Sequence, residues 1–212
     1  MRALIGIAAA LAALPLVSAS AQDISAPGTV AHRAARTGFP ERVGDFRRTH
    51  VLRYDQQGED LSANYDLIRD DGRMRLSIYI YPAPAAEPAA RTQACRAELD
   101  EVAQSITRQH GGAEQLESGE APAVPGSAPG LRLRSVHRIR IALRNPKPED
   151  VRSETRLFCY IDGGWQVKYR ISSNADFEVG NAIDTFIRLG PWPGRQPGEV
   201  VLRSHHRSGV LG

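Results

Sequence analysis

The stretch from Leu131 to Leu143 alternates between apolar and basic positions, and this alternation restricts the fold more than any other feature. One side of the alternation carries Leu131, Leu133, Ser135, His137, Ile139, Ile141 and Leu143. The other side carries Arg132, Arg134, Val136, Arg138, Arg140 and Ala142. A period of two predicts a β-strand with one face in the core and one face toward solvent. The chain is therefore expected to build a sheet with a buried apolar face.

Five further segments show a similar period and are predicted to be strands. They span residues 46–54, 61–67, 73–81, 153–161 and 165–171. Short turns with glycine, such as Asp70-Asp71-Gly72 and Asp162-Gly163-Gly164, join neighbouring strands. Two strands joined by a tight turn pair antiparallel, so we expect an antiparallel sheet.

Two segments are predicted to be helices, at residues 89–110 and 175–189. In the first, Cys95, Leu99, Val102 and Ile106 recur at helical spacing and form one apolar stripe. The order is thus three strands, a helix, three strands, a helix. We expect an α+β fold with a six-stranded antiparallel sheet and both helices on one side, because most strands are apolar on one face only. A three-layer α/β/α arrangement is the alternative.

The first 21 residues are predicted to be a cleaved signal peptide. Arg2 is followed by an uncharged run over residues 3–17 and by the small residues Ala19 and Ala21. A membrane anchor is the alternative, although the run is shorter than the roughly 20 apolar residues that a span requires. We therefore expect a periplasmic protein without a transmembrane segment in its mature form. Residues 22–38 are expected to be a disordered lead-in, residues 39–190 one domain, and residues 191–212 a tail.

The two cysteines, Cys95 and Cys159, are expected to form a disulfide, because exported proteins fold in an oxidising compartment. Cys95 lies on the apolar helix stripe, and Cys159 shares the strand face of Leu157 and Ile161. In the chain-entropy model, closing this loop contributes about 4 kcal/mol. Two separate buried thiols are the alternative.

No catalytic motif is present. The sequence has no His-Glu-x-x-His pattern, no cysteine cluster and no phosphate-binding glycine loop, so we expect no metal and no cofactor. A formal net charge of +3 makes nucleic acid a poor candidate partner for an exported protein. His137 shares the apolar face of its strand, which favours a hydrogen-bonded core histidine over a pocket or catalytic one.

The arginine side of the Leu131 strand is the best candidate binding surface. Guanidinium groups bind carboxylates and phosphates in pairs. The predicted binding residues are Arg132, Arg134, Arg138, Arg140, Arg156, Tyr160 and Arg170, with Phe158, Lys168, Tyr79 and Tyr81 as possible neighbours. The alternative is a solvated face whose arginine stems shield apolar surface and whose charges are balanced by Glu154 and other acids.

The segment from Phe39 to Pro82 contains Phe-Pro, a turn, three meandering strands and Tyr-Ile-Tyr-Pro. This layout resembles small uncharacterised envelope proteins of proteobacteria and, loosely, the PsbP/Mog1-like fold. The resemblance implies a sheet with helices on both faces and carries over no functional residue. We expect a non-enzymatic periplasmic binding or accessory protein that takes an anionic envelope component or a protein. The alternatives are a hydrolase-like enzyme with a site near His137, closed by the loop Glu114–Gly130, and a structural module that acts through a protein partner.

Overall fold

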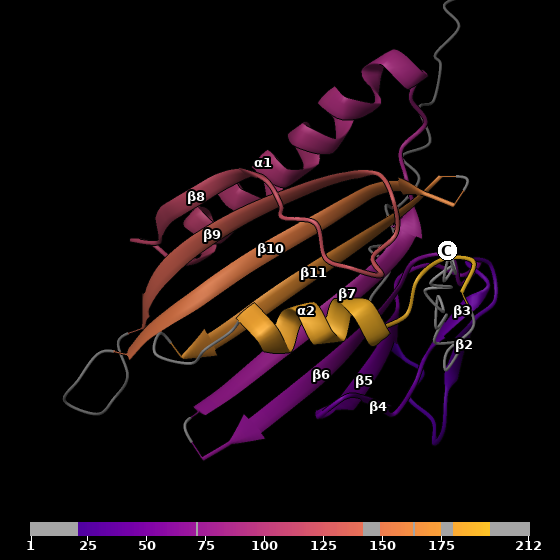
Figure 1. Cartoon of the computed structure of the whole chain (residues 1–212), viewed down its shortest axis with the longest axis horizontal. Coiled ribbons are helices and arrows are strands. Elements are labelled where there is room, and N and C mark those ends of the chain that lie inside the picture. Colours follow the sequence, from indigo (N-terminus) through magenta and orange to yellow (C-terminus); the bar gives the residue numbers. More distant parts are fainter. Residues whose placement is uncertain (1–20, 71, 142–148, 163, 175–179, 196–212) are drawn as a thin grey trace, which may run out of the picture.

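Figure 1 shows the fold in a computed structural model. The structure describes residues 21–195, except 71, 142–148, 163 and 175–179. Almost all of the predicted signal peptide, and residues 196–212, lie outside the described residues.

One large antiparallel sheet of nine strands forms the centre of the molecule. Its strands are β1 (Gln22–Asp23), β4 (Arg42–Val43), β5 (Phe46–Arg53), β6 (Leu61–Arg69), β7 (Gly72–Pro82), β8 (Glu114–Glu120), β9 (Leu131–Ile141), β10 (Glu149–Ile161) and β11 (Trp165–Asn174). They lie in the order β1-β5-β6-β7-β11-β10-β9-β8, and β4 also pairs with β5. A separate hairpin joins β2 (Val30–His32) to β3 (Thr37–Phe39).

The expectation of a six-stranded sheet is wrong, because the sheet contains three more strands. The six predicted strands are present as β5, β6, β7, β9, β10 and β11. The additional strands are β1, β4 and β8. Every residue of β8 is exposed, so the strand has no apolar alternation, and the sequence predicted a loop over Glu114–Gly130. β1 and β4 contain two residues each, which is too short for any periodicity.

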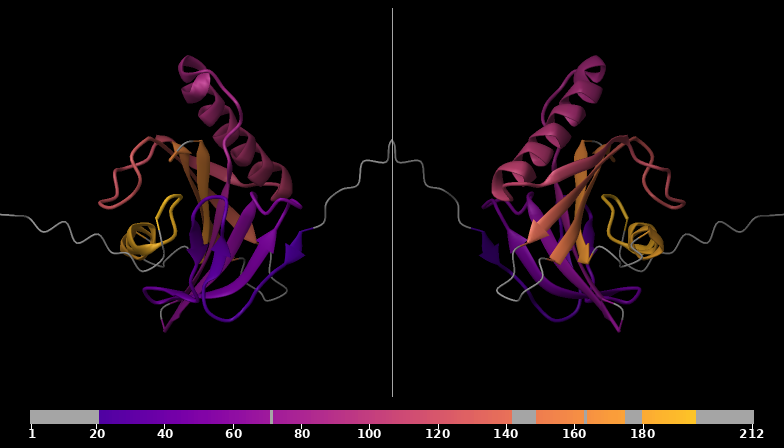
Figure 2. Two further views of the ribbon diagram at one scale, coloured as in Figure 1. Left: turned by 90° about the vertical axis from the view of Figure 1, so that its right-hand side faces the viewer. Right: turned by 90° about the vertical axis from the view of Figure 1, so that its left-hand side faces the viewer.

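The two helices cover opposite faces of the sheet, which corrects the expectation that they share one face (Figure 2). A short 3₁₀ turn, η1 (Pro88–Ala90), precedes α1 (Arg91–Gln109). Leu157 of β10 packs with Cys95 and Leu99 of α1. The next residue, Phe158, belongs to the larger core cluster together with Phe186 of α2 (Gly180–Leu189). Successive side chains of a strand point to opposite faces, so α1 and α2 lie on different sides of β10.

Both ends of the described chain belong to the fold. The expected disordered lead-in instead forms β1, β2 and most of β3, and it contributes His32, which is fully buried. The expected tail over residues 191–212 contains Trp192, which is 2% exposed and packs its ring against Phe158 and Tyr169. Its indole nitrogen donates a hydrogen bond to the carbonyl of Ile187, which fixes this segment to the end of α2.

Candidate binding surfaces of the sheet

The predicted arginine surface is not an open face, because α2 covers part of it. Arg156 is 6% exposed. Its guanidinium donates to Glu154 at 2.7 Å and to Asp184 of α2 at 2.7 Å. Burial alone would lower the pKa of Arg156, but Glu154 and Asp184 together raise it above its ordinary value. The side chain therefore stays charged and is held between strand and helix.

Carboxylates neutralise most of the neighbouring arginines. Arg134 pairs with Glu117 at 2.7 Å and lies 3.4 Å from Glu154. The more exposed Arg138 and Arg140 have partners of their own, and the pairs are Arg138–Glu114 at 3.3 Å and Arg140–Asp150 at 3.2 Å. These ion pairs agree with the alternative in which local acids balance the arginines.

The strand register divides the predicted binding residues between the two faces. Arg156 lies opposite Tyr169, so Arg170 projects from the other side of the sheet, the side of α1. Tyr160 adopts a left-handed backbone conformation with φ of 56° at an irregularity in β10. It packs with the α1 cluster, and its ring lies 4.9 Å from the guanidinium carbon of Arg91. Five predicted residues therefore occupy the α2 face and two occupy the α1 face.

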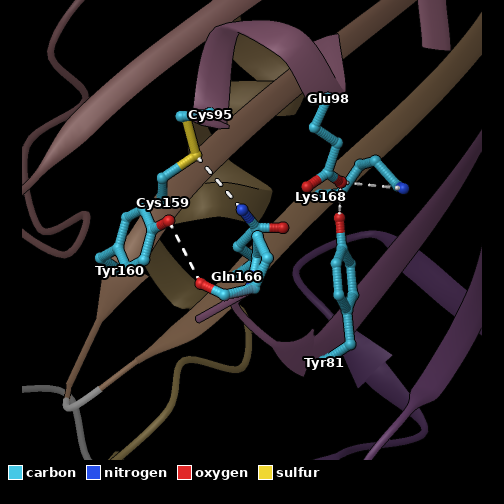
Figure 3. The surroundings of a disulfide bond; sticks show 8 residues. Tyr81, Cys95, Glu98, Cys159, Tyr160, Gln166 and Lys168 are labelled. Carbon is cyan, nitrogen blue, oxygen red and sulfur yellow. Dashed lines mark hydrogen bonds and ion pairs between the residues drawn. A yellow bond between two sulfur atoms is a disulfide. The ribbon is translucent and has the colours of Figure 1, made fainter. Parts of the chain in front are cut away.

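The disulfide Cys95–Cys159 confirms the predicted pairing and joins α1 to β10 (Figure 3). Beside it, Lys168 forms an ion pair with Glu98 at 3.3 Å, and the same carboxylate accepts a hydrogen bond from the hydroxyl of Tyr81. The ammonium of Lys168 also lies 4.9 Å from the centre of the Tyr81 ring. This cluster satisfies its own charges, so Lys168 is not a free cation.

Two adjacent rows of polar side chains cross the α1 face from β6 to β8, below the disulfide. Each row follows the strand register, one residue per strand. The first row is Asn64, Ser77, Arg170, Thr155, Ser135 and Ser118. The second row is Asp66, Arg75, Ser172, Ser153, His137 and Gln115. We call these two rows the polar band. In β9 and β10 they lie next to the apolar residues that pack against α1, and they end that apolar packing.

Arg170 is the unbalanced charge of the polar band. It has neither an ion pair nor a hydrogen bond with any residue that the structure describes. Its cross-strand neighbours are Ser77 and Thr155, whose Cβ atoms lie about 5 Å from its own in such a ladder. The hydroxyl of Thr155 is buried and has no hydrogen-bond partner among the described residues. A cation and an unused hydroxyl therefore lie side by side.

His137 lies in the same band, fully buried under α1. Its Nδ1 is 3.4 Å from the hydroxyl of Ser135, and its Nε2 has no partner within the described part of the chain. Burial lowers the pKa of His137, so the ring is neutral at pH 7. Ser135 is also fully buried, so no substrate can reach this serine–histidine pair in the conformation described.

Thr155, Ser77 and Asn64 were not among the predicted site residues. A signal for Thr155 existed, because the face that Leu157 and Cys159 define continues to Thr155 and Ser153. That continuation predicts a change from apolar to polar on one strand face. Ser77 and Asn64 gave no such signal, because serine and asparagine on the outward face of a strand are common on any solvated sheet.

No protein-family profile matches the sequence, and neither curated proteins nor solved structures show a significant similarity to it. The resemblance to PsbP/Mog1-like proteins thus stays a prediction. Within the described ranges, no helix has the length and apolarity to cross a membrane. The described residues also contain no group of three or more His, Cys, Asp or Glu that could hold a metal ion.

Proposed function

We propose that this is an exported, non-enzymatic binding or accessory protein that takes an anionic group on the polar band, at Arg170. The observation that carries the proposal is Arg170, a partly buried residue whose charge no carboxylate of the described chain balances. Four of the five predicted arginines of the α2 face are less suitable, because Arg134, Arg138, Arg140 and Arg156 are all paired.

The chemistry of the polar band favours a carboxylate or a phosphate. A guanidinium presents parallel N–H donors that fit two oxygens of either group. The hydroxyls of Ser77 and Thr155 add neutral donors on both sides of Arg170. A buried hydroxyl without a partner is unfavourable by about 1–3 kcal/mol, so a ligand oxygen that accepts from Thr155 would recover this penalty. Free phosphate and a lipid phosphate headgroup share this chemistry.

Export is supported by two features. The amino-terminal segment has the charge and hydropathy pattern of a signal peptide. The buried Cys95–Cys159 disulfide is of a kind that persists in oxidising compartments and is rare in the cytosol. Periplasmic location is therefore part of the proposal, and fractionation of cells that express the full chain tests it.

The test of the site compares Arg170→Gln with Arg140→Gln, which removes a paired arginine from the opposite face. Titration with inorganic phosphate, followed by NMR, should shift the amides of Arg170, Ser77 and Thr155 in the parent protein and in Arg140→Gln but not in Arg170→Gln. Co-sedimentation with phosphatidylglycerol vesicles, against phosphatidylcholine vesicles, distinguishes a headgroup from free phosphate. If Arg170→Gln responds to both probes as the parent does, the proposed site is wrong.

A further inference from the structure

His32 is a fully buried histidine that joins the β2–β3 hairpin to the main sheet. The hairpin is a two-stranded sheet of its own, and His32 is the last residue of β2. Its imidazole reaches the nine-stranded sheet, where Nε2 lies 3.2 Å from the backbone carbonyl oxygen of Ile80 in β7. A side chain of one sheet thus makes a hydrogen bond to the backbone of the other.

The second ring nitrogen fixes the protonation state of His32. The backbone amide of Ala35, in the turn between β2 and β3, donates to Nδ1 at 3.3 Å. Because a backbone N–H can only donate, Nδ1 must be unprotonated, and Nε2 must carry the proton that it donates to Ile80. Both hydrogen bonds therefore need the neutral ring. A second proton, on Nδ1, would face the Ala35 N–H and break that hydrogen bond.

The surroundings of the ring favour its neutral form. Trp165 packs against it in an edge contact, with ring centres 5.2 Å apart, and the ring of Phe39 lies 6.2 Å away. Burial lowers the pKa of His32, and this effect outweighs the opposite effects of the carbonyl of Ile80 and of the loop that follows β5. In that loop, the backbone of Glu59 and the carboxylate of Asp55 favour the protonated ring.

The other attachments of the β2–β3 turn are weak. Its charged residues, Arg33 and Arg36, are exposed, and Arg36 forms a solvent-exposed ion pair with Asp162 at 2.7 Å. Exposed ion pairs stabilise a fold by only about 0–1 kcal/mol. The carbonyl of Ala35 accepts one further hydrogen bond, from the amide of Gly194. The His32 ring is therefore a main contact between this turn and the sheet.

We propose that His32 is a pH-sensitive switch, whose protonation releases β2 and the β2–β3 turn from the main sheet. β3 stays in place, because Phe39 is buried in the large apolar cluster. The released form uncovers the carbonyl of Ile80 and the edge of Trp165 that His32 contacts. This inference is independent of the proposed anion site at Arg170.

The size of the effect follows from the direction of the pKa shift. In the released form, His32 is solvated and should have its ordinary pKa of 6.5, whereas the pKa in the closed form is lower. The closed form is therefore fully favoured above pH 6.5, and the released form gains population as the pH falls below it. Between pH 7.5 and 5, protonation favours the released form by up to about thirtyfold.

The test is amide hydrogen exchange at pH 7.5 and 5, expressed as protection relative to an unstructured peptide at the same pH. In the parent protein, the protection of Ala35 should fall by about tenfold or more in acid. At pH 5 it should also be at least tenfold below that of Ile78, a fully buried residue of β7. His32→Phe keeps an aromatic ring that cannot be protonated, so its Ala35 protection should be the same at both pH values. The matched control, His137→Gln, lacks the other fully buried histidine and should behave like the parent.

A second measurement needs no variant. An NMR titration of the parent, labelled with ¹³C in its histidine rings, should give the same midpoint for protonation of His32 as for the loss of protection at Ala35. The proposal fails if Ala35 in the parent is equally protected at pH 7.5 and 5, or if His32→Phe loses as much protection as the parent. Equal protection of Ala35 and Ile78 at pH 5 would show global unfolding and would also overturn it.

Discussion

Removing the Cys95–Cys159 disulfide should strongly lower the free energy of unfolding. The bridge acts in two ways: it constrains the unfolded chain, and it holds α1 to the sheet. The bridge spans a sequence separation of 64 residues. In the chain-entropy model, opening a loop of this size lowers the free energy of unfolding by about 4 kcal/mol at 25 °C. That is a large share of the 5–15 kcal/mol by which domains are normally stable.

The folded state adds a local consequence. The apolar cluster that holds α1 to the sheet contains five buried residues, and the two cysteines are among them. Further along α1, Ala103 and Ile106 are buried but belong to neither apolar cluster, because the strand face below them is the polar band. Without the bridge, α1 should therefore open locally before the sheet unfolds.

The assay is urea unfolding of the parent and of the double variant Cys95→Ala/Cys159→Ala, with amide hydrogen exchange on both. The variant should lose about 4 kcal/mol, and protection should fall first in α1 and remain in β10 and β11. The reduced parent protein serves as a control and should behave like the variant. A loss below about 1 kcal/mol, with unchanged exchange in α1, would refute this reasoning.

Three further predictions concern the interior. Arg156→Met should lower the free energy of unfolding, measured in urea, by roughly 2–3 kcal/mol. The reason is that Glu154 is 2% exposed and, without Arg156, keeps only its weaker contacts. The control Arg140→Met should have little effect on the free energy of unfolding. Trp192→Ala should lower it by about 3–5 kcal/mol if the end of the described chain is part of the core, and by almost nothing if it is a tail. Burial lowers the pKa of both His32 and His137 below 6.5, so their contribution to stability is complete above pH 6.5 and falls as the pH decreases below it. Urea unfolding at pH 7.5 and 5 should therefore show a smaller acid loss for His137→Gln than for the parent.

The sequence was sufficient for the elements whose side chains alternate or recur at helical spacing. All six such strands exist, α1 lies within two residues of its expected bounds, and the pairing of Cys95 with Cys159 followed from side-chain parity. β8 escaped prediction because an edge strand exposed on both faces carries no hydrophobic period. The faces of β10 were misassigned for the opposite reason. Alternation with the Leu157 face predicted that Arg156 and Phe158 face solvent, whereas the strand is buried on both sides.

The candidate sites depended on information that alternation does not contain. Alternation along one strand shows which of its residues share a face. The register between paired strands decides which of these faces lie on the same side of the sheet. The pairing of Arg156 with Tyr169 placed Arg170 on the opposite side of the sheet from Arg132 and Arg134. Ion pairing is equally invisible in the sequence, since the partner of Arg156 on α2 is separated from it by 28 residues.

The position of β10 between the two helices has a consequence for how the domain responds to load. All seven residues from 153 to 159 are buried, and Leu157 and Phe158 belong to the apolar clusters of different helices although one peptide bond joins them. A rotation of that peptide plane would move a residue of the α1 cluster and a residue of the α2 cluster at once. The backbone of β10 thus connects the two faces of the sheet directly. A structural change beside the disulfide can therefore reach the buried Arg156 on the other face through this strand alone.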